Sequence, residues 1–403
     1  MSTPRLARRL EHIEPFYVME LAKAASAVAA SPACDPARGG EPMLFLNIGE
    51  PDFTAAAPVQ AAAAAALAAG RTQYTDALGL WPLRERIAQW YAQRFGVVVE
   101  PSRIVVTAGA SAALQLVCLA LFEPGDEVLM ADPSYPCNRH FVAAAGATAR
   151  LLPAGPEHRF QPDAARVAAA WTPATRGVLL ASPGNPTGTS IAPEAMADIA
   201  RAVAARGGVT LVDEIYLGLS YDERFGRTAL ALAQDDAAVA DSLVSINSFS
   251  KYFGMTGWRL GWLVLPPALV APVERLAQNL YICPSTLAQH AALACFEPEA
   301  LAEFERRRAA FRERRDFVVP ALEALGLSVP VAPDGAFYAW FDCTRHARSS
   351  WDFCQRLLHE AHVALTPGRD FGPHAADRYV RLSFASSMAT LQQAMARLAR
   401  VLG

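Results

Sequence analysis

The sequence predicts an α/β fold in which a mainly parallel sheet is wrapped by helices. From about residue 100, short β-branched apolar runs alternate with longer helical patterns, which is typical of parallel strands joined by crossover helices. Polar and charged residues follow these runs, and in open α/β sheets ligands collect beyond the carboxyl ends of the strands. The fold class therefore predicts a ligand site at one edge of the sheet.

Five candidate strands follow one another along the chain, and each precedes a segment that can carry chemistry. The strands are expected at Ile104–Thr107, Glu127–Ala131, Gly177–Ala181, Val209–Val212 and Leu243–Asn247. Helices are expected at Ala113–Phe122 and Pro193–Ala205. The segments after the strands are Gly109-Ala110-Ser111, Pro133-Ser134-Tyr135-Pro136, Ser182 to Gly188, Asp213-Glu214-Ile215-Tyr216 and Ser248 to Lys251. Because the carboxyl ends of parallel strands share an edge, these segments should converge.

A sixth apolar run, Leu260–Leu265, tests this arrangement because Arg259 immediately precedes it. The run begins too soon after Leu243–Asn247 for a helical crossover, so the two runs should pair as antiparallel neighbours. An antiparallel strand starts at the edge where its partner ends, which brings Arg259 back to the ligand edge. Outside the sheet, the alanine-rich stretch Ala55–Gly70 predicts a surface helix, and Ser31–Glu41 predicts a loop within a domain.

Composition narrows the function classes. The chain of 403 residues is 53% apolar and 19% charged, as expected for a globular enzyme of two or three domains. Its net charge of −3 gives no reason to expect a nucleic-acid partner. No stretch predicts a membrane helix, and no apolar h-region follows the arginines of Met1–Phe16. Scattered cysteines without a CxxC pair indicate reduced thiols and a cytoplasmic location.

The segment Ser248-Phe249-Ser250-Lys251 is the most informative part of the chain. A lysine among small and aromatic residues gains little as a solubilising charge, whereas a neutral amine can condense with an aldehyde. Burial and a neighbouring cation would lower its pKa and populate that amine. Arg259 follows closely and suits the anionic end of whatever carries the aldehyde.

Three further residues stand where an ionic partner is expected. Asp213 comes directly after an apolar strand, where an unpaired carboxylate is costly, although Asp also favours helix N-caps in that position. Arg381 lies within the apolar run Tyr379–Phe384, which favours a bidentate anion or an internal salt bridge. Ser111 stands at a predicted helix start, where unpaired N–H groups attract anions.

Together these motifs resemble the class I/II aminotransferases of fold type I, the aspartate aminotransferase superfamily. The similarity extends from about Gly49 to Arg381, and its motifs occur in the family's order. Other segments that look like family landmarks are Pro124–Val128, Asp334–Tyr338 and Pro367–Gly372. The resemblance implies pyridoxal 5′-phosphate as the cofactor and no metal site.

The resemblance assigns the catalytic residues and the contacts to the cofactor ring. Lys251 would form the Schiff base and move the proton of the substrate, with Asp213 and Tyr216 as the other catalytic residues. Asp213 would pair with the pyridinium nitrogen. Asn185 and Tyr216 would donate to the phenolic oxygen of the ring, and Tyr135 would stack on its face.

The resemblance also assigns residues to the substrate and to the phosphate. Arg381, Asn185 and the backbone N–H of Gly49 would bind the α-carboxylate of the substrate. Tyr74 would reach the phosphate of the neighbouring subunit, unless it is an ordinary surface tyrosine. Each serine near the phosphate suits helix capping or loop hydrogen bonding equally well. The phosphate itself would be held by Ser111, Ser248, Ser250 and Arg259, and Gly109 and Ala110 would also bind the cofactor.

The resemblance further predicts the domain division, the assembly and the reaction. Residues 49–285 would form a large cofactor domain, and residues 1–48 with 286–403 a smaller α+β domain made from both chain ends. Two such chains would form a homodimer with shared active sites. An L-amino acid would pass its amino group to a 2-oxo acid, 2-oxoglutarate or pyruvate, in a ping-pong mechanism.

Substrate and reaction type leave alternatives open. Aspartate-specific relatives carry an arginine just before a Tyr-x-x-Pro that matches Tyr281–Pro284, where this chain reads Ala277-Gln278-Asn279-Leu280. A neutral or broad amino donor is therefore expected. One alternative is a carbon–sulfur β-lyase, which would use the same lysine and release ammonia. Another is a ligand-sensing regulator, for which the stretch before Gly49 leaves little room for a DNA-binding domain.

Overall fold

The computed structural model describes residues 4–13 and 17–403, and its centre is a seven-stranded sheet. The strand order is β2-β8-β7-β6-β5-β3-β4, and β8 is antiparallel to both of its neighbours while the other pairs are parallel. The predicted α/β fold with a mainly parallel sheet is thus confirmed. The strands are β2 (Ile104–Thr107), β3 (Glu127–Asp132), β4 (Thr148–Pro153), β5 (Thr175–Ala181), β6 (Val209–Asp213), β7 (Leu243–Ser248) and β8 (Gly261–Val264).

Each predicted run forms a strand of this sheet, and the antiparallel prediction for the sixth run is confirmed. Ser248, the last residue of β7, is paired with Gly261, the first residue of β8. Arg259, two residues before Gly261, therefore lies at the edge of the sheet where β7 ends. Strand β4 was not predicted. It is an edge strand that pairs only with β3, has a single β-branched residue in Thr148, and ends in Pro153. The signal that marks buried strands is therefore weak there.

Alternate residues of the central strands face two separate apolar cores. In β5, Val178 and Leu180 belong to one core and Leu179 to the other, which is the period of two expected for a strand. Helix α7 packs on the first core through Ile199, and helix α4 on the second through Val117. Because helices cover both faces, polar residues meet at the ends of the strands.

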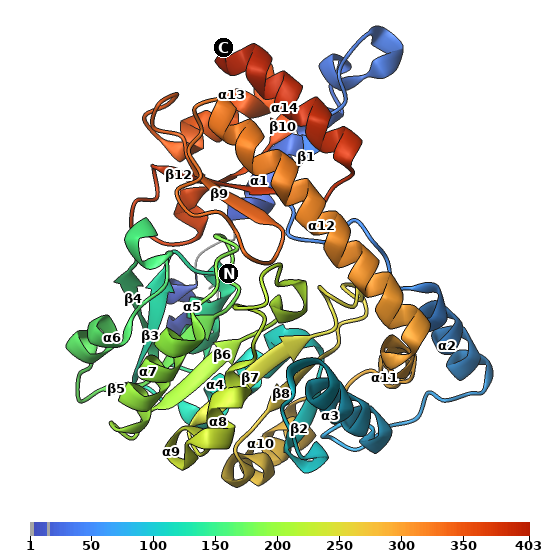
Figure 1. Cartoon of the computed structure of the whole chain (residues 1–403), viewed down its shortest axis with the longest axis vertical. Helices are drawn as coiled ribbons and strands as arrows, with labels where there is room; N and C mark the ends of the chain where they lie inside the picture. Colours follow the sequence, from blue (N-terminus) through green and yellow to red (C-terminus); the bar gives the residue numbers. More distant parts are fainter. Residues whose placement is uncertain (1–3, 14–16) are drawn as a thin grey trace.

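Helices alternate with strands as predicted, and Figure 1 shows them wrapped around the sheet. The expected crossover helices are α4 and α7. Helix α2 buries only two of its residues, which confirms the predicted surface helix, and Ser31–Glu41 is a loop with two short 3-10 turns. The helices are α1 (Tyr17–Ala29), α2 (Ala57–Ala68), α3 (Trp81–Phe95), α4 (Gly109–Leu121), α5 (Pro136–Ala144), α6 (Ala164–Ala170), α7 (Pro193–Ala204), α8 (Leu232–Asp235), α9 (Ala237–Ala240), α10 (Pro267–Leu280), α11 (Thr286–Leu293), α12 (Pro298–Ala324), α13 (Ser350–Glu360) and α14 (Met388–Leu402).

Segments from both end regions of the chain form a second, smaller body above the sheet (Figure 1). Strand β1 (Leu44–Phe45) pairs with β10 (Val363–Ala364), and a second small sheet has the order β11-β12-β9. The long helix α12 runs from α2 to α14 and so links the two bodies. The strands of the second sheet are β9 (Tyr338–Asp342), β11 (Thr366–Pro367) and β12 (Tyr379–Ser383).

The domain boundaries at 48/49 and 285/286 stay predictions. Helix α11, just beyond the second boundary, packs mainly against α2 and α3. In the predicted N-terminal segment 1–48, residues 1–3 and 14–16 lie outside the described residues. Across the described ranges, no helix is both long and apolar enough to cross a membrane.

Candidate active site

A cavity of about 500 Å³ lies at the carboxyl edge of the sheet. Segments that follow β2, β3, β5, β6 and β7 line it on one side, and helix α1 lines it on the other. The structure therefore brings together the five segments that topology predicts to converge. The predicted residues in its lining are Gly49, Ala110, Ser111, Tyr135, Asn185, Asp213, Tyr216, Ser248, Ser250, Lys251, Arg259 and Arg381.

Lys251 follows β7 and turns its amine into the cavity. Nζ donates to the carbonyl oxygen of Gly49 at 2.5 Å and lies 5.8 Å from the ring centroids of Tyr216 and Phe337. Burial lowers the pKa of Lys251 to about 8, and the positive charge of Arg381 acts in the same direction. A larger fraction of this amine is neutral at pH 7 than for an ordinary lysine, which is the state a nucleophile needs.

An anion cradle lies where Arg259 meets the start of α4. Arg259 Nη1 donates to Ser250 Oγ at 3.4 Å, and the Ser250 N–H donates to Ser248 Oγ at 3.0 Å. Gly109 has a φ of 85°, a conformation that favours glycine, and the position a Cβ would take lies 2.7 Å from Arg259 Nη2. Ser111 stands in the first turn of α4, where N–H groups have no intrahelical acceptor.

Arg259 itself is held in an uncommon backbone conformation. Its φ of 51° lies in the left-handed region, which costs a non-glycine residue about 1–2 kcal/mol. Such strain clusters at functional sites, where the surrounding structure enforces it. The turn between β7 and β8 therefore places Arg259 in the lining of the cavity, where it is still exposed to solvent.

Asp213 is the last residue of β6 and is buried. Its Oδ1 accepts the N–H of Ile215 at 3.2 Å, and it forms no salt bridge with any described residue. Burial raises the pKa of Asp213 to about 6, while the Ile215 N–H and the charge of Lys251 lower it. Asp213 is not an N-cap of an α-helix, because the next α-helix along the chain, α8, begins only at Leu232. A buried carboxylate of this kind stabilises a cation placed beside it.

Arg381 lies in β12 and is almost fully buried. Nη1 donates to Asn185 Oδ1 at 2.8 Å, Nη2 donates to the Asn47 carbonyl oxygen at 2.7 Å, and Nε has no partner. The guanidinium also lies over the rings of Tyr338 and Phe371. The internal salt bridge considered above is absent among the described residues, so an anionic ligand remains the charge partner this arginine lacks.

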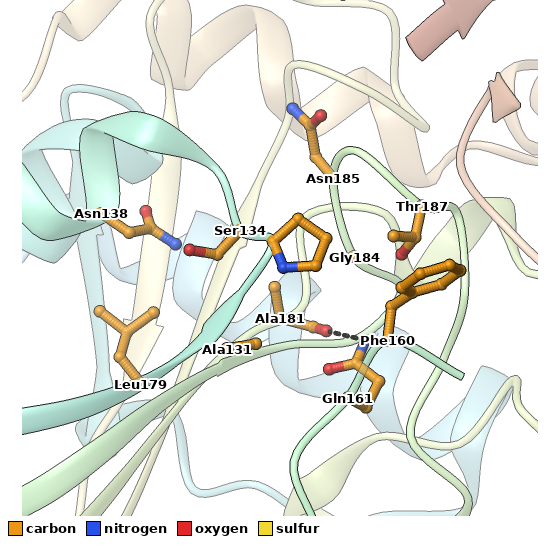
Figure 2. Close-up of a pocket in the computed structure, with 11 residues that line it drawn as sticks. Ala131, Ser134, Asn138, Phe160, Gln161, Leu179, Ala181, Gly184, Asn185 and Thr187 are labelled. Carbon is orange, nitrogen blue, oxygen red and sulfur yellow. Dashed lines mark hydrogen bonds between the residues drawn. The ribbon is translucent and has the colours of Figure 1, made fainter. Parts of the chain in front are cut away.

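The loop that carries Asn185 is held in place by hydrogen bonds from the side chain of Gln161. Figure 2 shows a small cavity beneath this loop, with Gln161 hydrogen-bonded to Ala181. Gln161 Nε2 donates to the carbonyl oxygens of Ala181 at 3.1 Å and Thr189 at 3.0 Å, one on each side of the loop. The loop thus presents the amide of Asn185 to Arg381 in a defined position, since both of its ends are tied to one side chain.

Tyr338 lines the cavity but was not predicted as a site residue. Its hydroxyl is 2.7 Å from the hydroxyl of Tyr216, and a Cβ at Gly49 would come within 2.6 Å of it. Burial raises the pKa of both tyrosines, so both hydroxyls stay protonated. Tyr338 was visible in the landmark Asp334–Tyr338, but nothing in that motif indicates which side of β9 faces the cavity.

Helix α1 supplies an apolar wall that was also not predicted. Val18, Met19 and Ala22 of α1 line the cavity together with Ile48 and Leu114. The spacing of Val18 and Ala22 places them on one face of the helix. An amphipathic pattern can be read from the sequence, but the element that it faces is set by tertiary packing.

Two predicted residues lie outside the lining. Gly109 packs directly behind Arg259. Tyr74 is 79% exposed and contributes nothing to this cavity within one chain, as expected for a residue assigned to the neighbouring subunit or for a surface tyrosine. Among the described residues, no group of three or more His, Cys, Asp or Glu side chains could hold a metal ion.

The arrangement fits pyridoxal 5′-phosphate on its own features. The cavity offers a partly neutral amine at Lys251, a buried carboxylate at Asp213 for a ring nitrogen, and a cradle at Arg259 for a phosphate. A separate arginine with an unpartnered Nε, Arg381, remains for a carboxylate of the substrate. Fold and site therefore define an α/β enzyme that binds an aldehyde cofactor carrying a phosphate.

Comparison with known proteins agrees with this class. Residues 41–398 match the family model described as aminotransferase class I and II. Valine–pyruvate aminotransferase of Mycobacterium tuberculosis is 40% identical over 98% of both chains, and arginine–pyruvate transaminase of Pseudomonas aeruginosa is 37% identical over 89% of this chain and 90% of its own. A crystal structure of a Mycobacterium tuberculosis aminotransferase superposes with a TM-score of 0.91 at 40% identity. The structure of Thermus thermophilus aspartate aminotransferase with maleate superposes with a TM-score of 0.89 at 33% identity. The first covers 99% of both chains, and the second covers 99% of this chain and 100% of its own.

The chain belongs to the class I and II aminotransferases. It is accordingly a pyridoxal-phosphate-dependent aminotransferase. The family resemblance, the cofactor and the enzyme class predicted from the sequence are confirmed, and the regulator alternative is not supported.

Proposed function

We propose that this enzyme transfers the amino group of an apolar L-amino acid to pyruvate or 2-oxoglutarate in a ping-pong exchange. The observation that carries the donor class is the charge of the cavity lining. Lys251, Arg259 and Arg381 are the basic side chains among the described lining residues. The cofactor and the substrate α-carboxylate engage all three, so this chain offers no further cation for a carboxylate on the donor's side chain.

The same charge argument and the relatives support pyruvate as the acceptor. Its methyl group needs no cation, whereas 2-oxoglutarate carries a second carboxylate. Two relatives are named for reactions with pyruvate, one with valine and one with arginine. The apolar wall of α1 suits a valine-like side chain better than a charged one.

Each predicted catalytic residue has a defined task in this proposal. Pyridoxal phosphate, when bound, withdraws electrons from Cα and carries the amino group between the two substrates. Lys251 supplies the neutral amine that attaches the cofactor and then moves the proton at Cα. Asp213 keeps the ring nitrogen protonated. Tyr216 donates to the ring oxygen and is positioned by the hydroxyl of Tyr338. Arg381 orients the α-carboxylate of the substrate.

The remaining predicted contacts complete the proposal. Tyr135 covers one face of the ring, and Asn185 reaches both the ring oxygen and the carboxylate that Arg381 binds. Gly49 presents backbone to the same carboxylate. The phosphate is held by Ser111, Ser248, Ser250 and Arg259, and Gly109 and Ala110 also bind the cofactor.

We also propose a homodimer with shared active sites in the cytoplasm. Tyr74 is 79% exposed, and Leu280 and Ile282 are 49% and 53% exposed. A second copy of the chain can cover these exposed aromatic and apolar side chains. In this assembly Tyr74 reaches the phosphate of the partner's site. The scattered free thiols suit a reducing compartment.

The experiment that tests the reaction is a donor half-reaction without any oxo-acid acceptor. Holoenzyme mixed with each amino acid should release one equivalent of the matching oxo acid, convert the cofactor to its aminated form and liberate no ammonia. A β-lyase would instead release ammonia and pyruvate over many turnovers from cysteine or cystathionine. That result would reject the transaminase proposal.

A further inference from the structure

Helix α1 forms the side of the cavity that faces the charged sheet edge. Val18 and Ala22 line the cavity one helical turn apart, with Met19 between them, 57% exposed. Leu21 and Ala25, which lie beside Val18 and Ala22 around the helix, anchor it in a small apolar core. The helix is therefore a fixed apolar wall whose distance from the charged groups depends on how its ends are held.

The start of α1 is capped from the far end of the chain. Asp370 accepts from the first two described N–H groups of the helix. Its Oδ1 accepts the Tyr17 N–H at 3.0 Å and its Oδ2 accepts the Val18 N–H at 2.8 Å. Both donors belong to the first turn, which has no intrahelical acceptor.

The capping carboxylate belongs to the same segment that flanks the carboxylate-binding arginine. Asp370 is buried at the end of a short 3-10 helix. The guanidinium of Arg381 lies over the ring of the next residue, Phe371, 4.9 Å from the ring centroid. Arg369, on the other side, lies over the ring of Tyr17 at 4.5 Å. One short segment thus contacts both the start of α1 and Arg381.

We propose that α1 is the wall that selects the donor's side chain, and that Asp370 is the positioning residue that sets the distance between this wall and Arg381. This inference rests on the proposed function, because it concerns the donor of that reaction. Every donor presents the same α-carboxylate to Arg381, whereas only a long apolar side chain reaches Val18 and Ala22. A displaced wall should therefore change the preference among donors more than the reaction itself.

The test compares leucine with alanine as donor in the Asp370→Ala holoenzyme. The ratio of kcat/KM for leucine over that for alanine should fall about fivefold, through a higher KM for leucine, because loss of a capping carboxylate loosens the first turn by that order. Any electrostatic effect of the lost charge on Arg381 acts on both donors and cancels in the ratio. Asp370→Asn keeps one acceptor oxygen and should fall between wild type and Asp370→Ala.

Two readouts separate positioning from general damage. Hydrogen exchange of residues 17–22 should be faster in Asp370→Ala, and calorimetric binding of 4-methylvalerate, an unreactive apolar carboxylate, should weaken while binding of acetate changes less. The matched control is Asp163→Ala, which removes a capping carboxylate from α6, where Asp163 accepts the Arg166 N–H at 2.7 Å away from the cavity. It should speed exchange in α6 alone and leave donor preference unchanged.

A second variant keeps the inference testable if Asp370→Ala does not fold. Ala22→Phe adds bulk from α1 into the cavity and should lower the leucine-to-alanine ratio as well. An unchanged ratio in both variants, with wild type active on both donors, would overturn the role of α1. A wild-type holoenzyme that transaminates no amino acid would instead overturn the proposed function, so the two failures are distinguishable.

Discussion

The two sides of the cavity differ in chemistry and in where they come from in the chain. The sheet edge is polar and charged, and its residues follow successive strands between about residues 107 and 259. The side formed by α1, Ile48 and Tyr338 is mainly apolar or aromatic and comes from both chain ends. In the proposed function, reaction chemistry and donor preference would therefore be carried by separate parts of the fold, which can change independently.

The largest expected effect comes from the sheet edge, at Lys251. Lys251→Ala should abolish both covalent cofactor attachment and transamination, because no other amine lies in the lining. The chain has just one other lysine, Lys23, so borohydride reduction followed by peptide mass spectrometry reads the site without ambiguity. Lys23→Ala is the matched control and should keep the label on Lys251. A reduced cofactor bond that persists in Lys251→Ala would refute the assignment.

The next largest effect is expected at Arg381, where the two sides meet. Arg381→Lys keeps the charge but loses the fork that binds a carboxylate through two parallel hydrogen bonds. The loss is about 3 kcal/mol, on the order of a hundredfold in kcat/KM for every donor. The control is Arg378→Lys. Arg378 directly precedes the same strand, β12, and its guanidinium forms a salt bridge with Asp342. Equal kcat/KM values for Arg381→Lys and wild type would show that another group binds the α-carboxylate.

The pH dependence of cofactor attachment tests the electrostatics of the sheet edge. The deprotonated amine is the reactive form, and burial lowers the pKa of Lys251 to about 8. The attachment rate of the cofactor-free chain should therefore rise about tenfold per pH unit below pH 8 and level off above it. Stopped-flow absorbance measures this rate. A rate that keeps rising up to about pH 10 would mean an ordinary lysine.

The smallest effect is expected on the chain-end side, at Tyr338. Tyr338→Phe removes one hydrogen bond to Tyr216, a loss of about 1 kcal/mol, and should lower kcat about fivefold with little change in cofactor binding. Tyr379→Phe, a buried tyrosine stacked on Trp340 away from the cavity lining, serves as the control. A loss as large as that of Arg381→Lys would place Tyr338 among the catalytic groups and break the division between the two sides.

The sheet edge could be predicted from the sequence because local signals and topology agree there. Strand runs, the residues after them and the antiparallel return at Arg259 follow from short segments. The chain-end side could not be predicted in the same way. The contacts between Asp370 and the start of α1 join residues more than 350 positions apart, and no local pattern records that pairing. The edge strand β4 was missed because edge strands need little β-branched or apolar sequence.

The most direct test of the account is the donor half-reaction of the wild-type holoenzyme with leucine and with aspartate, followed as single turnovers. The account predicts that the rate constant divided by the apparent dissociation constant is at least about tenfold higher for leucine, because an unpaired carboxylate against the apolar wall costs more than 1.4 kcal/mol. Aspartate reacting as fast as leucine, or faster, would contradict the claim that the chain-end side selects apolar donors.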